Sequence, residues 1–209
     1  MNVYFMRHGM TDWNLYRKIQ GQTDISLNQI GQKQADNARI VLKDYNFDKC
    51  FCSPLGRAQE TARRVLQDKN IDIVTNDLIK EISYGVDEGQ DLDLIEKDSS
   101  VPLHNYFFAP DLYIPPQNGE TIPEVVTRCA KFLNFLQVNC TANSNILAVC
   151  HGAFIQGVIM AVKKTPYADF WKVKAQKNCA ITSFTFKDGK WQMLQEAVDI
   201  LGTEKLSMF

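Results

Sequence analysis

The 209-residue sequence predicts an α/β fold: a three-layer α/β/α sandwich with a mostly parallel central sheet, an inserted helical lid and a C-terminal edge hairpin. Three observations support this prediction. Short apolar runs typical of buried strands alternate with segments of helical periodicity. An acidic segment that contains several prolines interrupts the alternation, and a turn with Asp-Gly at its centre follows near the C-terminus. Alternating strands and helices favour a parallel sheet covered on both faces.

The first half of the sequence predicts a β-α-β-α-β series. The expected elements are a strand at Asn2 to Met6, a helix from Ser26 or Asn28 to about Asp44, a strand at Asp48 to Cys52, a helix from Ser53-Pro54 through Gln67 and a strand at Ile71 to Val74. The first apolar run is short and is soon followed by a glycine, which favours a strand over a helix. Pro54 suits the first turn of the helix that it opens.

The second half contains the lid and the end of the sheet. The expected elements are a lid of short helices at about 85–125, a helix at Glu120 to Val138, a strand at Asn145 to Cys150, a helix at Ala153 to Val162, and hairpin strands at Ala180 to Phe186 and Trp191 to Glu196. The lid is interpreted as an insertion rather than as a separate domain. With 45% hydrophobic residues, the chain suits a single domain over residues 1–209.

Composition excludes some classes of partner. The net charge of −1 creates no global field that would attract nucleic acid or an anionic membrane, so neither is expected as a partner. The N-terminal apolar run covers only Val3 to Met6 before Arg7 interrupts it, and no later run approaches the length of a membrane span. We therefore expect a cytoplasmic protein.

Six cysteines are scattered along the chain without a CxxC pair. In a chain of this size they are expected to be reduced and mostly buried thiols. Cys50 and Cys52 would face the same side of a strand, which leaves a metal site as an alternative, although no third ligand lies nearby in the sequence.

Charged side chains follow two of the predicted strands. Arg7, His8 and a glycine come directly after the first strand, and His151-Gly152 comes directly after the strand that ends at Cys150. Parallel sheets bind ligands outside the carboxyl ends of their strands, where Arg57 is also expected. The glycines, Gly152 among them, allow close approach of backbone to a ligand.

Two guanidiniums and two imidazoles with few carboxylates nearby suit a tetrahedral dianion, and this composition predicts a phosphate ligand. One imidazole would attack phosphorus as a nucleophile, while the other, in its protonated form, would stabilise the developing charge. Because these groups already supply positive charge, neither a metal nor a cofactor is expected.

Five segments of the sequence resemble the signature segments of the histidine phosphatase superfamily, which includes the cofactor-dependent phosphoglycerate mutases. They are RHGMTDWN, SPLGRAQETA, KEISYG, NGET and CHG, in that order, over positions 7 to 152. The first of them, with RHGMT where mutases usually have RHGES, is closer to the phosphatase branch of this phosphoglycerate mutase-like family.

The resemblance implies roles for individual residues. His8 would carry the phosphoryl group, Arg7, Arg57 and His151 would clamp it, Asn14 would help to hold it, and Gly21, Gln22 and Thr23 would form substrate-side contacts. Glu81 would protonate the departing alkoxide and then activate water. Glu88 is kept as an alternative acid. His104, in the lid, has no partner motif and is interpreted as structural, and Trp13 is expected to pack beneath its loop, with stacking on a substrate as the alternative.

The lid distinguishes between three candidate functions: a phosphomonoester hydrolase, a phosphoglycerate mutase and a non-catalytic phospholigand-binding module. Similar mutases carry a basic lid, whereas the segment from Gly85 to Val125 has no arginine, one lysine and nine acidic residues. We therefore expect a phosphatase of the histidine acid phosphatase type that acts on a small phosphorylated metabolite. A mutase would need basic residues from outside the lid, such as Arg17 or Lys18. A homodimer is left open.

Apolar lid residues could cover the body of a hydrophobic substrate. They are Leu103, Tyr106, Phe107, Phe108, Leu112, Tyr113 and Ile114. The sequence does not separate those that would line a pocket from those that would form the core of the lid.

Overall fold

A six-stranded sheet with the order β3-β2-β4-β1-β5-β6 forms the centre of the computed structural model, which describes residues 1–202, 204 and 206. The strands are β1 (Asn2–Arg7), β2 (Lys49–Cys52), β3 (Ile73–Thr75), β4 (Asn145–Cys150), β5 (Ile181–Lys187) and β6 (Lys190–Val198). The first four strands pair in parallel, while β5 and β6 form an antiparallel hairpin next to β1. The mostly parallel sheet and its C-terminal edge hairpin are confirmed.

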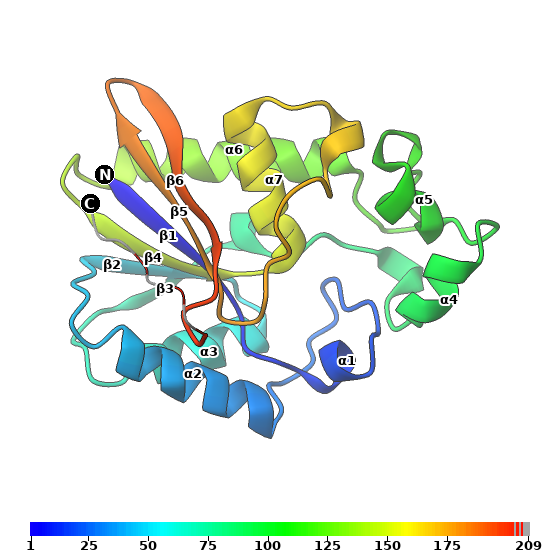
Figure 1. Ribbon diagram of the computed structural model, residues 1–209. Helices are drawn as coiled ribbons and strands as arrows, with labels where there is room; N and C mark the ends of the chain where they lie inside the picture. Colours follow the sequence, from blue (N-terminus) through cyan, green and yellow to red (C-terminus); the bar gives the residue numbers. More distant parts are fainter. Residues whose placement is uncertain (203, 205, 207–209) are drawn as a thin grey trace.

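Helices cover both faces of the sheet (Figure 1). The main helices are α2 (Gln29–Val41) and α3 (Gly56–Val65) on one face and α6 (Ile122–Asn139) and α7 (Gly152–Lys163) on the other. Because successive side chains of a strand point to opposite faces, Val3 and Phe5 of β1 pack in the cluster that contains α6 and α7. Tyr4 and Met6 pack in the cluster that contains α2 and α3. The predicted three-layer sandwich is confirmed.

The lid is the segment 85–121, and it extends from one end of the sandwich (Figure 1). Its elements are two short helices, α4 (Leu92–Lys97) and α5 (Leu103–Phe108), and 3-10 turns at Gly85–Asp87 and Pro110–Leu112. A second segment, which contains Trp171, contacts the lid. Trp171, just beyond the 3-10 turn Tyr167–Asp169, donates a hydrogen bond from Nε1 to the carbonyl of Tyr106 at 2.8 Å.

Several predicted boundaries are wrong by a few residues. Helix α3, which was expected to start at Ser53-Pro54, begins at Gly56 with Leu55 at its N-cap, so Pro54 lies outside it. Ser53 instead forms a turn, because its Oγ accepts a hydrogen bond from the backbone N–H of Leu55 at 3.3 Å. The strand expected from residue 71 begins at Ile73. Helix α2 ends at Val41 and α6 begins at Ile122. The cap of α2 is Asn28, one of the two caps that the sequence offered.

One helix that the sequence did not predict lies in the loop after β1. It is α1 (Asp12–Leu15), and Thr11 caps it through reciprocal hydrogen bonds with Asn14. This capping box ends in the same asparagine that the sequence assigned to substrate binding. None of the helices in the described part of the chain is long and apolar enough to cross a membrane.

Candidate active site

The carboxyl ends of neighbouring strands bring the two motif histidines together. Arg7 pairs with Cys150 in the register of β1 and β4, so His8 and His151 leave adjacent strands at the same edge. Their ring centroids are 5.2 Å apart. His8 is 2% exposed, and His151 and Arg57 are fully buried. The structure thus places two imidazoles and a guanidinium in one buried cluster, with the partly buried Arg7 beside it.

His8 has one ring nitrogen free for chemistry. Its Nδ1 lies 2.7 Å from the carbonyl oxygen of Gly9. Because a carbonyl only accepts hydrogen bonds, Nδ1 carries the hydrogen and Nε2 keeps its lone pair. Burial, followed by the charges of Arg57 and Arg7, lowers the pKa of His8 well below its ordinary value. The ring is therefore neutral at pH 7, as a nucleophile must be.

His151 is held by a serine. Its Nε2 lies 2.7 Å from Oγ of Ser53, while its Nδ1 is buried and has no hydrogen-bond partner among the described residues. Burial, followed by the charge of Arg57, lowers the pKa of His151 well below its ordinary value. The protonated His151 that the sequence suggested therefore requires a bound anion to offset the two guanidiniums.

The two arginines are partly occupied by backbone carbonyls. Arg7 donates from Nη1 to Gln176 at 2.6 Å, and Arg57 donates from its terminal nitrogens to Thr23 at 2.8 Å and Gly21 at 2.6 Å. The Nε of each arginine is buried without an acceptor in the described part of the chain. Burial lowers the pKa of Arg57 to about 10, so its charge persists at pH 7. A buried donor without an acceptor costs about 1–3 kcal/mol, and a bound anion would satisfy both.

Glu88 holds the loop that contains the predicted substrate contacts. Its carboxylate accepts hydrogen bonds from the backbone N–H groups of Gln22 at 2.9 Å, Thr23 at 2.7 Å and Tyr84 at 3.1 Å. Gly21 has a φ of +55°, and a Cβ there would lie 2.0 Å from Glu88 Oε1, so only glycine fits. Glu88 therefore has a structural role. The carbonyls of Gly21 and Thr23 accept hydrogen bonds from Arg57, and residues 21–23 do not line the cleft between the sandwich and the lid.

Glu81 lies at the N-terminus of α7, against the backbone that follows His151. Its carboxylate accepts hydrogen bonds from the N–H groups of Ala153 at 3.1 Å and Phe154 at 2.9 Å. Burial raises the pKa of Glu81, and this effect outweighs the opposing effects of those hydrogen bonds and of Arg57. A carboxyl with a raised pKa beside the cluster fits the role of a general acid.

Arg128 of α6 holds the segment that carries Glu81, and the sequence analysis missed it. Its guanidinium donates to the carbonyls of Leu78 at 2.9 Å, Lys80 at 2.7 Å and Glu81 at 3.2 Å. It also forms an ion pair with Glu120 at 2.8 Å. The available signal was an arginine within the apolar pattern of the predicted helix at residues 120–138.

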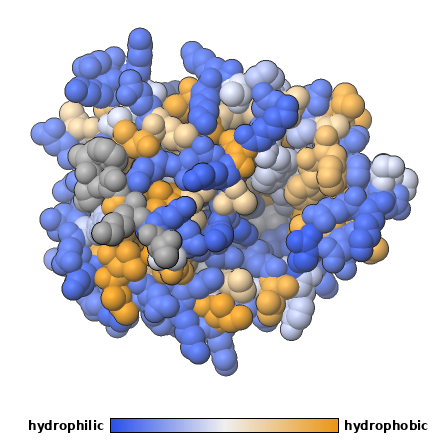
Figure 2. Space-filling model, viewed as in Figure 1, coloured by the Kyte–Doolittle hydropathy of each residue, from blue (hydrophilic) through white to orange (hydrophobic). Residues whose placement is uncertain are grey.

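A cleft of about 520 Å³ opens above this cluster, between the sandwich and the lid. At its inner end lie Arg7, Asn14, Glu81 and Gly152, together with Asn178. Asn178 donates a hydrogen bond to the carbonyl of His8 at 3.0 Å and another to Oδ1 of Asn14 at 3.3 Å. The sequence analysis also missed Asn178, which follows no motif. Figure 2 shows the surface hollowed between the lid and the C-terminal strands.

The outer wall of the cleft is aromatic. It contains Trp13, Tyr84, Phe107 and Trp171. Phe107 and Trp171 stack with centroids 5.6 Å apart, and Trp13 also packs against Gly89, so it both lines the cleft and supports its loop. The aromatic wall is therefore built from three separate parts of the chain.

The structure divides the seven apolar lid residues into three groups. Phe107 alone among them lines the cleft. Leu103, Tyr106 and Tyr113 are buried in the lid core, whereas Phe108, Leu112 and Ile114 are 58%, 64% and 76% exposed on its outside. Of the seven, only Phe107 is therefore placed to contact a substrate in the cleft.

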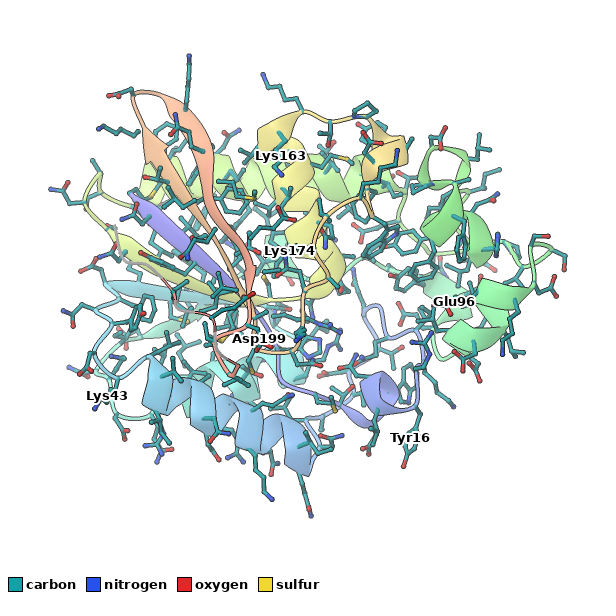
Figure 3. The ribbon with its side chains drawn as sticks, viewed as in Figure 1. Tyr16, Lys43, Glu96, Lys163, Lys174 and Asp199 are labelled. Carbon is teal, nitrogen blue, oxygen red and sulfur yellow. The ribbon has the colours of Figure 1, made fainter. Side chains whose placement is uncertain are left out.

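The acidic lid neutralises the arginine at the mouth of the cleft. Arg17 forms ion pairs with Asp93 at 2.6 Å and with Glu96, labelled in Figure 3, at 2.8 Å. Lys18 also lines the mouth and remains exposed. A carboxylate of a substrate would therefore compete with two lid carboxylates for Arg17.

The cysteines take no part in the site. Cys50 and Cys52 are free and buried on the same face of β2, and burial raises the pKa of Cys50 to about 12. Within residues 1–202, 204 and 206, no group of three His, Cys, Asp or Glu side chains could hold a metal ion. The alternative of a metal site at this pair gains no support.

These features define an α/β protein with a buried pair of histidines and an arginine at the carboxyl ends of its strands. The family model of the histidine phosphatase superfamily (branch 1) matches residues 3–199, and the chain belongs to this superfamily. Among curated proteins, an uncharacterized phosphatase, PhoE, of Bacillus subtilis is 33% identical over 193 residues, which cover 91% of each chain. GpmB of Cronobacter sakazakii, named a probable phosphoglycerate mutase, is 30% identical over 91% of this chain and 87% of its own.

Solved structures extend the likeness to the whole fold. YhfR of Bacillus stearothermophilus superposes with a TM-score of 0.88 at 27% identity, over 96% of this chain and 99% of that one. A phosphoserine phosphatase mutant from Entamoeba histolytica, in complex with phosphoserine, superposes with a TM-score of 0.82 at 29% identity, over 94% and 96% of the two chains. The fold predicted from the sequence is that of known phosphatases.

Proposed function

We propose that this protein hydrolyses the phosphomonoester of a small metabolite through a phosphohistidine at His8. The observation that carries the proposal is the buried cluster itself. A neutral imidazole with a free Nε2 lies among two guanidiniums, and the Nε donors of Arg7 and Arg57 have no acceptor among the described residues. A phosphoryl group would satisfy those donors and stand next to the nucleophile.

In the first step, the lone pair on His8 Nε2 attacks phosphorus and the P–O bond to the alcohol breaks. Glu81 gives its proton to the departing oxygen, because an alkoxide is a poor leaving group. His151 supports this step. The dianionic phosphate raises its pKa again, and the imidazolium then donates a hydrogen bond to a phosphoryl oxygen.

In the second step, the Glu81 carboxylate takes a proton from water and the water oxygen attacks phosphorus. The N–P bond breaks, which releases inorganic phosphate and returns His8 to its neutral form. The hydrogen bond from Nδ1 of His8 to Gly9 keeps Nε2 aimed at phosphorus in both steps. Glu81 ends the cycle protonated, ready for the next ester.

Phosphoglycerate mutase is the second candidate, because a relative with 30% identity carries that name. A mutase must retain a phosphorylated acid while its two phosphates exchange with the histidine. The only arginine among the residues at the outer end of the cleft, Arg17, is already paired with two lid carboxylates. This charge arrangement favours transfer of the phosphoryl group to water.

Rapid quenching with a ³²P-labelled ester tests the proposal. Wild-type protein should trap acid-labile, base-stable label, and His8→Ala should trap none and lose at least about 10⁴-fold in turnover. His104→Ala is the matched control, because that histidine lies in the lid, where its Nδ1 is 2.8 Å from the carbonyl oxygen of Ile95 and its ring stacks on Phe108. Label that persists in His8→Ala would refute the assignment.

A further inference from the structure

Gln156 carries a hydrogen-bond acceptor beside the cleft that has no partner among the described residues. It lies on α7, is 3% exposed and lines the cleft. Its Nε2 faces the carbonyl of Lys174 at 3.4 Å, and this carbonyl can only accept, so the amide nitrogen must be the atom on that side. Oε1 then points away from Lys174, and it has no hydrogen-bond partner in the described part of the chain. Figure 3 labels Lys174 on the connection that runs beside α7.

Gln156 lies about one helical turn from the inner end of the cleft, where the phosphate is proposed to bind. Gly152 and Gln156 are four residues apart on one helix, so they share a face and are separated by about 6 Å along the axis. Gly152 borders Arg7, since a Cβ built on it would lie 3.7 Å from Arg7 Nε. A group held by Gln156 would therefore belong to the alcohol part of the substrate and not to its phosphate.

The surroundings of Gln156 restrict what that alcohol part can be. The outer wall is aromatic, and Trp171 is fixed there by its hydrogen bond to Tyr106 and its stacking on Phe107. Water cannot readily hydrogen-bond to a buried amide oxygen beside such a wall. A ligand that provides a hydrogen-bond donor would therefore be bound more tightly there. The wall itself favours an apolar or aromatic body.

We infer that Gln156 determines specificity: its Oε1 accepts a hydrogen bond from an amino or hydroxyl group of the alcohol, while the apolar body of that alcohol packs on the aromatic wall. The inference rests on the proposed function, because it names the substrate class of the same site. The preferred esters carry a hydrogen-bond donor near the phosphate and no second negative charge. A carboxylate in place of the donor would face the lone pairs of Oε1 and be rejected.

Two esters that differ by one group test this inference. They are 3-phenylpropyl phosphate and 2-amino-3-phenylpropyl phosphate, and kcat/KM is measured for both. We expect wild-type protein to prefer the amino ester and Gln156→Leu to lower that preference by about tenfold, the value of one charge-assisted hydrogen bond. Intrinsic differences between the esters cancel when the two proteins are compared. An equal preference in both proteins would overturn the inference.

Further variants separate a lost hydrogen bond from a damaged fold. Gln156→Glu keeps an acceptor and should preserve or increase the preference for the amino ester, whereas Gln156→Met should lose it as Gln156→Leu does. Gln137→Leu is the matched control, because this glutamine is exposed on α6 and does not line the cleft. A change of preference in Gln137→Leu equal to that in Gln156→Leu would also overturn the inference.

Binding measurements distinguish failure of the inference from failure of the proposed function. Calorimetry on His8→Ala gives dissociation constants for both esters without turnover, and adding Gln156→Leu should remove the difference between them. If wild-type protein hydrolyses neither ester while the binding difference depends on Gln156, the inference stands and the proposed function fails. If hydrolysis proceeds and binding never depends on Gln156, the inference fails alone.

Discussion

The inner and outer ends of the cleft are built in different ways. Beneath the inner end, behind the lining residues Arg7, Glu81 and Gly152, the cluster of His8, Arg57 and His151 is at most 2% exposed. Its members lie directly at the ends of β1 and β4 or at the start of α3. At the outer end, Phe107 and Trp171 are partly exposed and come from the lid and from the segment after α7. The comparison teaches that, under the proposed function, the sandwich would fix the chemistry, while segments outside it would select the substrate.

Burial explains why the inner end has so little freedom. Buried charges and imidazoles require defined partners, and here Arg57 is fixed by two backbone carbonyls while His151 is fixed by Ser53. The outer end consists of rings and exposed ion pairs, which tolerate replacement at small cost. Changes at the two ends should therefore have effects of different size and kind.

The largest effect after loss of His8 is expected from Glu81→Gln. Without a proton donor, hydrolysis of alkyl phosphates should fall by roughly 10² to 10⁴, and that of aryl phosphates much less, because a stable leaving group needs little protonation. Steady-state kinetics on one ester of each kind measure the ratio. Glu88→Gln is the comparison, since loosening its loop should slow both esters alike. Equal losses in Glu81→Gln would mean that Glu81, too, is structural.

The state of the two histidines is directly measurable by NMR of ¹⁵N-labelled imidazoles. Both pKa values are lowered, so both rings should remain neutral as the pH falls through 6, where an ordinary imidazole with a pKa of about 6.5 would be roughly 75% protonated. His8 thus keeps, below about pH 6.5, the neutral form that the proposed nucleophile requires. Added phosphate should raise the pKa of His151. Protonation of His8 at or above pH 6.5 in the free protein would contradict the burial argument.

At the outer end, freeing Arg17 should change selectivity by a few-fold. The double variant Asp93→Asn with Glu96→Gln removes both partners of the guanidinium, which should raise kcat/KM for phosphoserine and 3-phosphoglycerate by about 3- to 10-fold. Asp98→Asn with Asp111→Asn removes the same charge from the lid and leaves the Arg17 pairs intact. Similar gains in both double variants would assign the effect to overall lid charge.

The same assays compare hydrolase with mutase. Wild-type protein primed with bisphosphoglycerate should interconvert 2- and 3-phosphoglycerate more slowly than it hydrolyses its best ester. Mutase turnover well above hydrolysis would show that Arg17 or Lys18 binds the carboxylate in spite of the lid.

The smallest effect is expected from removal of divalent metal ions. Guanidiniums and a histidine would supply the positive charge that a metal provides in other phosphatases. Dialysis against EDTA should therefore leave the hydrolysis rate unchanged within experimental error. Loss of activity that Mg²⁺ or Mn²⁺ restores would mean that the inner end lacks sufficient charge of its own.

The strand ends explain why so much of the inner end was predictable. The carboxyl ends of parallel strands lie at one end of the sheet, so residues that directly follow β1 and β4 are expected there, and the pairing of the two strands brings them together. Arg7, His8 and His151 satisfy this condition. The outer end was not predictable in the same way: helical periodicity did not distinguish Phe107, which lines the cleft, from Phe108, which faces outward.

By itself, the sequence determined the layered fold and the end of the sheet at which Arg7, His8 and His151 meet, because local periodicity and strand-end position follow from the order of residues. Only the tertiary structure decided that Glu88 braces a loop, that Arg128 holds the backbone of Glu81 and that Gln156, which lines the cleft, keeps a buried amide oxygen without a partner among the described residues. Each of these depends on side-chain direction and on contacts between distant segments, such as Arg128 with Leu78. Periodicity carries no information about either, since both are set by how the lid and helices pack on the sheet.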